Sequence, residues 1–378
     1  MNAHSPQRQL RRLLTLRAAV CIGLLITALS GCLLLGLVLL HALEGAATAT
    51  AGMALTALLA VAWTAVRLTR WLWVPTPECT GIVLPDALAP GFRRRIDRLC
   101  ERLGARRIDR VLATPEVNAA VVCRPAFGLF GPMRTTLLLG IPLAHCLTPQ
   151  QLSAVLAHEL AHLSAQRGRR GAWAAHLRTW WLRCFDRIDE DSGGLARIAR
   201  RVFAGTARTD LEQSVQLSRL DEFEADALAA RAVGAPALAG ALIDLALKDR
   251  FLTENYWAKV MEQARSRHRP RIRPFREMGL GMQVGFVRDD ALADLDHLLG
   301  ARDDTATFDT HPALAERLAA LDIDHSGGLP DAADGPSAAE HYFADLLPTL
   351  SLAFDRMWWL ASSRDWRQQY RSARADRR

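Results

Sequence analysis

Residues 148–165 read TPQQLSAVLAHELAHLSA, and this stretch predicts one long buried helix. Thr148, the proline after it and Gln151 are typical of an N-cap, a first-turn proline and a capping-box partner. Leucine and alanine then recur at helical spacing on several sides, as in a helix that is covered by protein. We therefore expect a buried helix that begins near Pro149 and ends near Gly168.

The same stretch carries a metal-ligand pattern, His158-Glu159-Leu160-Ala161-His162. Side chains at i and i+4 lie on one side of a helix, so His158 and His162 can bind one zinc ion together. Glu159 points about 100° away and can reach a water molecule in the open position of the metal. A buried helix that carries these residues by chance is the alternative. Three ionisable groups in so apolar a helix are costly unless paired or metal-bound, which favours a zinc hydrolase.

A third protein ligand is needed, and the residues after the motif exclude one class of zinc protease. That class has a glycine and then a histidine at positions where this chain has Ala165 and Gly168. The best remaining candidate is Glu222, at the start of another helical stretch. Asp226 lies four residues further on the same helical side, where it can accept a hydrogen bond from a ligating histidine. Asp221 and Glu224 point elsewhere and fit a solvated helix end.

Several motifs in this order resemble the M48 family of zinc metallopeptidases, which includes the bacterial membrane heat-shock protease and the eukaryotic CAAX prenyl endopeptidase. They are His158 to His162, residues 219–226 (RLDEFEAD), Thr310-His311-Pro312 with Arg317, and residues 115–119 (PEVNA). The resemblance covers about residues 80–325. It implies a zincin-like α+β fold, mainly α, with a small β-sheet beside the zinc helix.

The resemblance also implies roles for residues outside the zinc motif. Asn118 and Ala119 would belong to an edge strand along which a peptide substrate lies, although Asn118 reads equally well as a turn residue. His311 and Arg317 would approach the zinc site and hydrogen-bond the scissile carbonyl or its developing charge. A histidine beside a proline is otherwise a common helix cap.

These residues predict a mechanism with one zinc ion per chain. His158, His162 and Glu222 hold the zinc, which lowers the pKa of its water, and Glu159 takes the proton as general base. Gly-x-Ser-x-Gly is absent, and none of the seven cysteines forms a Cys-x-x-Cys pair. An acyl-enzyme or a cysteine-zinc site therefore has no support.

The N-terminal region predicts a transmembrane hairpin. Residues 18–43 and 46–66 contain no Lys or Arg and no acidic residue, and each is long enough to cross a bilayer. A secretory signal is the alternative for the first stretch, but a second span follows at once. We expect a basic N-terminus over residues 1–17, then a hairpin over 18–70.

Charge around these stretches predicts the orientation. Arginines 8, 11, 12 and 17 precede the first span and arginines 67 and 70 follow the second, whereas only Glu44 lies between. The positive-inside rule then places the catalytic domain in the cytoplasm, at the inner membrane. An odd number of cysteines without disulfide spacing agrees with a reducing compartment.

The distribution of charge and the absence of certain motifs indicate which partners the protein binds. The net charge of +7 comes largely from the basic N-terminus and from the tail of residues 364–378, which suit an anionic lipid surface. No zinc finger or phosphate loop argues for nucleic acid. We expect a peptide or protein substrate and a lipid bilayer as partners, while the oligomeric state is open.

Three further segments have weaker patterns. Tryptophans 173, 180 and 181 repeat at helical spacing near arginines, and this helix either lies on a membrane or packs in a core. Residues 264–277 predict an exposed basic loop that would steer acidic peptides. Residues 326–378 predict a linker, then a C-terminal amphipathic helical region that is kinked or restarted at Pro348.

The sequence as a whole predicts a membrane-anchored zinc endopeptidase. The resemblance implies a role in membrane protein quality control or protein maturation. The alternative from another class is a non-catalytic membrane adaptor or chaperone that keeps the metallopeptidase scaffold for binding.

Overall fold

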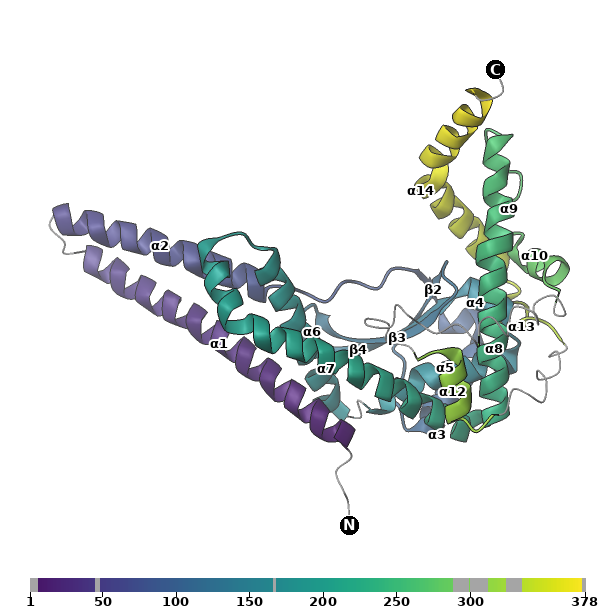
Figure 1. Cartoon of the computed structure of the whole chain (residues 1–378), viewed down its shortest axis with the longest axis horizontal. Helices are drawn as coiled ribbons and strands as arrows, with labels where there is room; N and C mark the ends of the chain where they lie inside the picture. Colours follow the sequence, from purple (N-terminus) through teal and green to yellow (C-terminus); the bar gives the residue numbers. More distant parts are fainter. Residues whose placement is uncertain are drawn as a thin grey trace, which may run out of the picture. The chain divides into compact units, whose positions relative to one another are not determined.

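The structure is a computed structural model of the whole chain, and it describes residues 6–44, 48–165, 168–287, 299, 312–323 and 335–375 (Figure 1). The chain divides into two compact units. The first contains residues 1–78, 124–133 and 168–220. The second contains residues 79–123, 134–167 and 221–378. Each unit is described separately below.

The first unit is built on two long apolar helices, α1 (Pro6–Leu43) and α2 (Thr48–Leu72). Both are long and apolar enough to cross a membrane, and only 11% and 6% of their most apolar windows are buried inside the protein. Leucines 33, 34 and 37 are examples of large side chains left exposed on α1. Such exposed apolar surface is unfavourable in water and suits a bilayer. Residues 194–233 and 235–265 would form a third span only if these two helical segments, which are bent by 120° at their junction, counted as one broken span.

Helix α6 (Gly168–Glu190) and the first part of α7 (Gly194–Val233) complete the first unit. Trp180 and Trp181 are buried in one cluster with side chains of α1 and α2. The Trp180 indole donates to the Leu72 carbonyl at 2.9 Å, and the Trp181 indole donates to Asp210 at 3.0 Å. The sequence left open whether this helix lies on a membrane or packs in a core. Trp180 and Trp181 pack in a core. The core that they join is the base of the apolar hairpin.

The second unit contains a four-stranded mixed sheet in the order β1-β2-β4-β3. Strand β1 (Ile82–Leu84) pairs antiparallel with β2 (Arg110–Thr114), which pairs parallel with β4 (Phe130–Gly140). Strand β3 (Ala119–Phe127) lies at the other edge. Residues 124–133, where β3 turns into β4, belong to the first unit.

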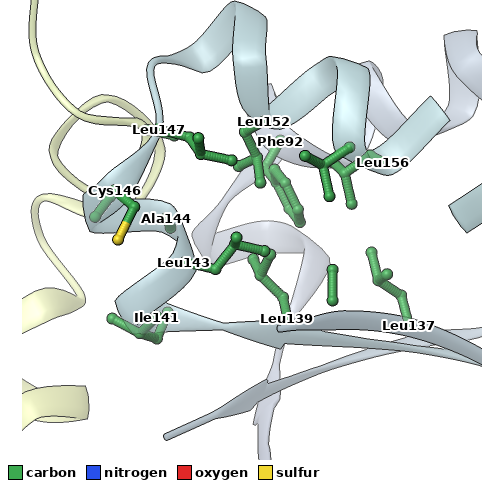
Figure 2. Close-up of a cluster of buried hydrophobic side chains, with 14 of the residues drawn as sticks. Phe92, Leu137, Leu139, Ile141, Leu143, Ala144, Cys146, Leu147, Leu152 and Leu156 are labelled. Atoms are coloured by element: carbon green, nitrogen blue, oxygen red, sulfur yellow. The ribbon is translucent and has the colours of Figure 1, made fainter. Parts of the chain in front are cut away.

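Helices α3 (Pro90–Leu103) and α5 (Pro149–Ala165) pack on this sheet. Figure 2 shows Leu137 and Leu139 of β4 facing Leu152 and Leu156 of α5, with Phe92 of α3 beside them. Apolar side chains on the strands and on several sides of α5 close this core. The expected buried helix and small sheet are confirmed.

The remaining helices surround this core. They are η1 (Asp86–Leu88), α4 (Ile141–Cys146), α8 (Ala235–Phe251), the π-turn η2 (Leu252–Tyr256), α9 (Trp257–Glu262), η3 (Gln263–Arg265), α10 (Met278–Gly285), α12 (Leu314–Ala320), α13 (Ala338–Phe343) and α14 (Leu347–Ala375). Because α13 ends at Phe343 and α14 begins beside Pro348, the C-terminal apolar stripe restarts there. The proline occupies the first turn of α14, where its missing N–H costs nothing.

Candidate metal centre

Helix α5 starts at a complete capping box, as its sequence predicts. The Gln151 N–H donates to Thr148 Oγ1 at 3.3 Å, and the Thr148 N–H donates to Gln151 Oε1 at 3.0 Å. These bonds satisfy backbone donors that would otherwise be unpaired at the helix start. The helix then continues without interruption through His158 and His162, so both imidazoles lie on one side of it.

The end of α7 brings the acidic residues to the same place. Glu222 and Asp226 are buried, with 4% and 1% of their surface exposed, and they lie one helical turn apart. Ala225 and Ala229 are also buried, and their small side chains allow this end of α7 to lie close to its neighbours. Glu224 lies on the exposed side of the helix, as expected.

His158, His162 and Glu222 form a small triangle of residues, in which each imidazole approaches a different oxygen of the Glu222 carboxylate. His158 Nε2 lies 3.2 Å from His162 Nε2 and 3.4 Å from Glu222 Oε2, and His162 Nε2 lies 3.3 Å from Glu222 Oε1. Ligands bound tetrahedrally at the usual Zn–N and Zn–O distances are about 3.3–3.4 Å apart. Two imidazoles and one carboxylate with this spacing fit a zinc ion. Within the described ranges, this is the one cluster of His, Cys, Asp and Glu with metal-binding geometry.

A second layer holds one of these histidines in place. His158 Nδ1 donates to Asp226 Oδ1 at 2.7 Å, which leaves Nε2 facing the triangle. Arg317 of α12 donates to both oxygens of Asp226, from Nη2 at 2.7 Å and from Nε at 2.8 Å. This paired geometry is the strongest form of arginine–carboxylate hydrogen bonding. Arg317 was expected to approach the zinc site, and its Nη2 lies 3.3 Å from His158 Nδ1. A hydrogen bond from Arg317 to the scissile carbonyl stays a prediction.

The charges of this pocket favour a cation. Burial alone would lower the pKa of His158, but its hydrogen bonds to Asp226 and Glu222 outweigh burial and raise that pKa to about 9. Burial would raise the pKa of Asp226, but hydrogen bonds from Arg317 and His158 lower it below its ordinary value. Asp226 therefore stays ionised, and these hydrogen bonds stabilise positive charge at His158.

Glu159 differs from its neighbours in exposure. His158 and Leu160 are buried, whereas Glu159 is half-buried. Its position on α5 turns it about 100° away from His158 around the helix axis. A carboxylate that is next to the ligand side and accessible to water can accept a proton there.

The predicted substrate strand also has a defined place. Ala119 is the first residue of β3 and Asn118 directly precedes it, at the edge of the sheet. The Asn118 carbonyl accepts a hydrogen bond from the Gly140 N–H at 2.8 Å. A side chain at Gly140 would collide with the carbonyl oxygens of Glu116 and Asn118, so this close approach requires glycine. His311, predicted to approach the site, lies outside the described residues.

One contact near the site had no signal in the sequence. Gln151 Nε2 donates to Asp244 of α8 at 2.6 Å, and both side chains are buried. Gln151 was predicted only as a capping residue. The bond joins the start of α5 to a helix that is distant in the sequence, and no local pattern would have revealed it.

Comparison with known proteins identifies a family for this arrangement. A family model described as Peptidase family M48 matches residues 101–324. The matched segment contains the histidine pair, Glu222, Asp226 and Arg317. No curated protein and no solved structure matches the chain.

Proposed function

The chain belongs to peptidase family M48, and from this premise we propose that it is a zinc-dependent endopeptidase with one zinc ion per chain. The observation that carries this proposal is the cluster of His158, His162 and Glu222, which can offer one ligand atom each within 4.8 Å of one another. Its shortest contacts, 3.2–3.4 Å, are close to the ligand spacing of tetrahedral zinc. When bound there, zinc supplies Lewis acidity, which polarises a carbonyl oxygen and lowers the pKa of a water molecule.

The side chains around the triangle divide the remaining work. Glu159 accepts a proton from the attacking water and later returns it to the leaving amine as the peptide bond breaks. Asp226 holds the imidazole of His158 in one tautomer and one orientation. Arg317 acts through Asp226, because its two hydrogen bonds fix that carboxylate.

The substrate in this proposal is an extended peptide on the edge strand. Strand β3 lies at the edge of the sheet, so a peptide can extend the sheet there by backbone hydrogen bonds, beginning near Asn118 and Ala119. His311 is proposed as a donor to the scissile carbonyl. An edge strand binds a peptide through hydrogen bonds to its backbone, and these do not depend on particular side chains. This kind of binding suits the cleavage of unfolded segments in quality control or protein maturation.

The membrane placement follows from charge. We propose that α1 and α2 both cross the inner membrane and that the peptidase domain faces the cytoplasm, because Arg8, Arg12 and Arg70 flank the spans on one side. A reporter fused after Arg378 is expected to be active only in the cytoplasm. Activity only outside the inner membrane would contradict this orientation.

One pair of variants tests the chemistry. Glu159→Gln should keep its zinc and lose cleavage of casein by a factor of about 10²–10⁴, because the general base is removed while the ligands stay. Glu224→Gln is the matched control, since the same substitution falls on an exposed side chain of α7. Zinc is measured by elemental analysis of the purified full chain.

The outcomes separate the proposal from its alternatives. Equal cleavage by wild type and Glu159→Gln would show that Glu159 is not the base. Zinc in the wild type without any cleavage would favour the non-catalytic adaptor. Absence of zinc after purification in zinc-containing buffer would rule out the metal site itself.

A further inference from the structure

Two basic segments that are far apart in the sequence lie against each other in the second unit. One is residues 264–277, which begin within η3, and the other is residues 360–375, the C-terminal half of α14. The indole of Trp366 is buried and donates to the Arg267 carbonyl at 2.9 Å. The rings of His268 and Tyr370 meet edge to face at 5.7 Å, and the Arg374 guanidinium lies 5.7 Å from the centre of the Tyr370 ring. Tyr370 thus links the loop to the arginines of the helix.

We call the exposed arginines of these two segments the arginine surface. All ten are exposed, and they are Arg265, Arg267, Arg269, Arg271, Arg273, Arg276, Arg364, Arg367, Arg371 and Arg374. Residues 264–277 and 360–375 contain only two acidic residues, Glu277 and Asp365. The two segments together therefore carry a formal charge of +8, more than the +7 of the whole chain.

The four arginines of α14 lie in a single stripe. Positions 364, 367, 371 and 374 are separated by three or four residues, so their side chains fall within about 80° of the helix circumference. Towards the start of the helix, Met357 and Leu360 continue this stripe and are 50% and 72% exposed. Asp365 lies about 100° from Arg364 around the helix and lines a groove with Arg265 and with Glu262 of α9.

We propose that the arginine surface binds the headgroups of anionic phospholipids. Arginine fits a phosphodiester with paired hydrogen bonds, and a dense positive surface is attracted to an anionic bilayer. The exposed Met357 and Leu360 add apolar side chains next to the charges, the pattern of a helix that lies in a membrane interface. The chain also has two helices that could cross a membrane, and a protein anchored in this way is in contact with a lipid bilayer.

Nucleic acid is the other polyanion to consider, and the aromatic residues argue against it. Single strands bind through bases stacked on exposed aromatic rings beside the positive charges. Here Trp366 is fully buried, and Tyr370 is half-buried between His268 and Arg374. The aromatic side chains hold the two segments together and do not form an open platform.

The test uses the full chain embedded in discs of phosphatidylcholine, mixed with separate liposomes that sediment. Liposomes that contain phosphatidylglycerol should carry the protein into the pellet, and pure phosphatidylcholine liposomes should not. The variant R364Q/R367Q/R371Q/R374Q should bind the anionic liposomes about tenfold or more weakly, because each arginine near such a surface contributes several-fold. The corresponding four Arg→Lys changes should retain most of the binding.

The matched control removes the same charge from another face. R94Q/R98Q/R102Q/R107Q changes four exposed arginines on and just after α3 and should bind as the wild type does. Circular dichroism melting shows whether each variant is folded.

The proposal would be overturned if the Arg→Gln variants of α14 and of α3 lost equal amounts of binding to anionic liposomes. It would also be overturned if the wild-type protein pelleted equally well with neutral liposomes. Binding of a labelled RNA oligonucleotide that depends on the α14 arginines, without binding to anionic liposomes, would assign the surface to nucleic acid instead. None of these readouts depends on proteolysis.

Discussion

Among the residues that the structure describes, each unit contains a buried aspartate that is bound by an arginine and by the N–H of an aromatic ring. In the second unit, Asp226 is 1% exposed and binds Arg317 and the His158 imidazole. In the first unit, Asp210 is 2% exposed and binds Arg17 at 3.2 Å and the Trp181 indole at 3.0 Å. The burial and the types of partner are nearly the same.

The ring partner distinguishes the two sites. An indole has one polar atom, so Trp181 has nothing left to offer once it has donated to Asp210. An imidazole has two, so His158 presents a second nitrogen to His162 and Glu222 while the first is held. A buried carboxylate with similar partners therefore has two uses. Asp210 joins helices in the first unit, whereas Asp226 orients the candidate metal ligand His158 in the second. Substitutions in the two sites test this distinction.

The largest effect is expected when the carboxylate of the second unit is removed. Asp226→Ala leaves the guanidinium of Arg317 buried without its partner and should cost about 3–5 kcal/mol in the free energy of unfolding. Chemical denaturation of the detergent-solubilised, metal-free protein measures this. The double variant Asp226→Ala/Arg317→Met removes both charges and should recover part of the loss. If it recovers nothing, the pair does not interact as described.

Zinc affinity is the next measure. Asp226→Asn keeps the shape of the side chain but loses the charge that holds His158, and zinc affinity should fall by a factor of about 10–100. Competition with a chromophoric chelator measures it. Asp210→Asn is the matched change in the first unit and should leave zinc affinity as in the wild type. A similar loss in both variants would mean that the effect reports general destabilisation.

Trp181→Phe tests the structural role of the first unit. It removes the indole donor to a buried carboxylate and should lower the free energy of unfolding by about 1–3 kcal/mol without changing zinc affinity or casein cleavage. Trp173→Phe removes the same atoms from a half-buried residue of α6 and should cost less. A larger cost at Trp173 would show that lost ring packing, and not the bond to Asp210, dominates.

The smallest effect is expected at Arg17, whose side chain is 31% exposed. Arg17→Lys should cost less than about 1 kcal/mol, because water screens the pair and lysine can still reach Asp210. Arg317→Lys should cost clearly more, since lysine cannot form the paired bonds that Arg317 makes to Asp226. Equal costs, measured by denaturation under the same conditions, would mean that the paired geometry adds nothing.

Local patterns in the sequence were sufficient to predict much of the candidate metal centre. The capping box at Thr148 and the spacing of His158 and His162 depend only on helix geometry, and both are present as predicted. Glu222 and Asp226 were paired by the same four-residue rule, and they lie on one buried side of α7. That α7 brings this side to the two histidines was expected because a zinc ion needs a third protein ligand, and local spacing alone does not show it.

The sequence by itself determined which side chains share a helix face, because helical periodicity is a local property of the chain. It predicted the apolar hairpin, the helix of His158 and His162, and a kink or restart of the last helix at Pro348. Only the tertiary structure decided which faces meet: Arg317 bonds to Asp226 across 91 positions, and Trp366 bonds to the Arg267 carbonyl across 99. These pairings depend on how the core closes, since packing selects among many contacts that local propensity leaves equally available.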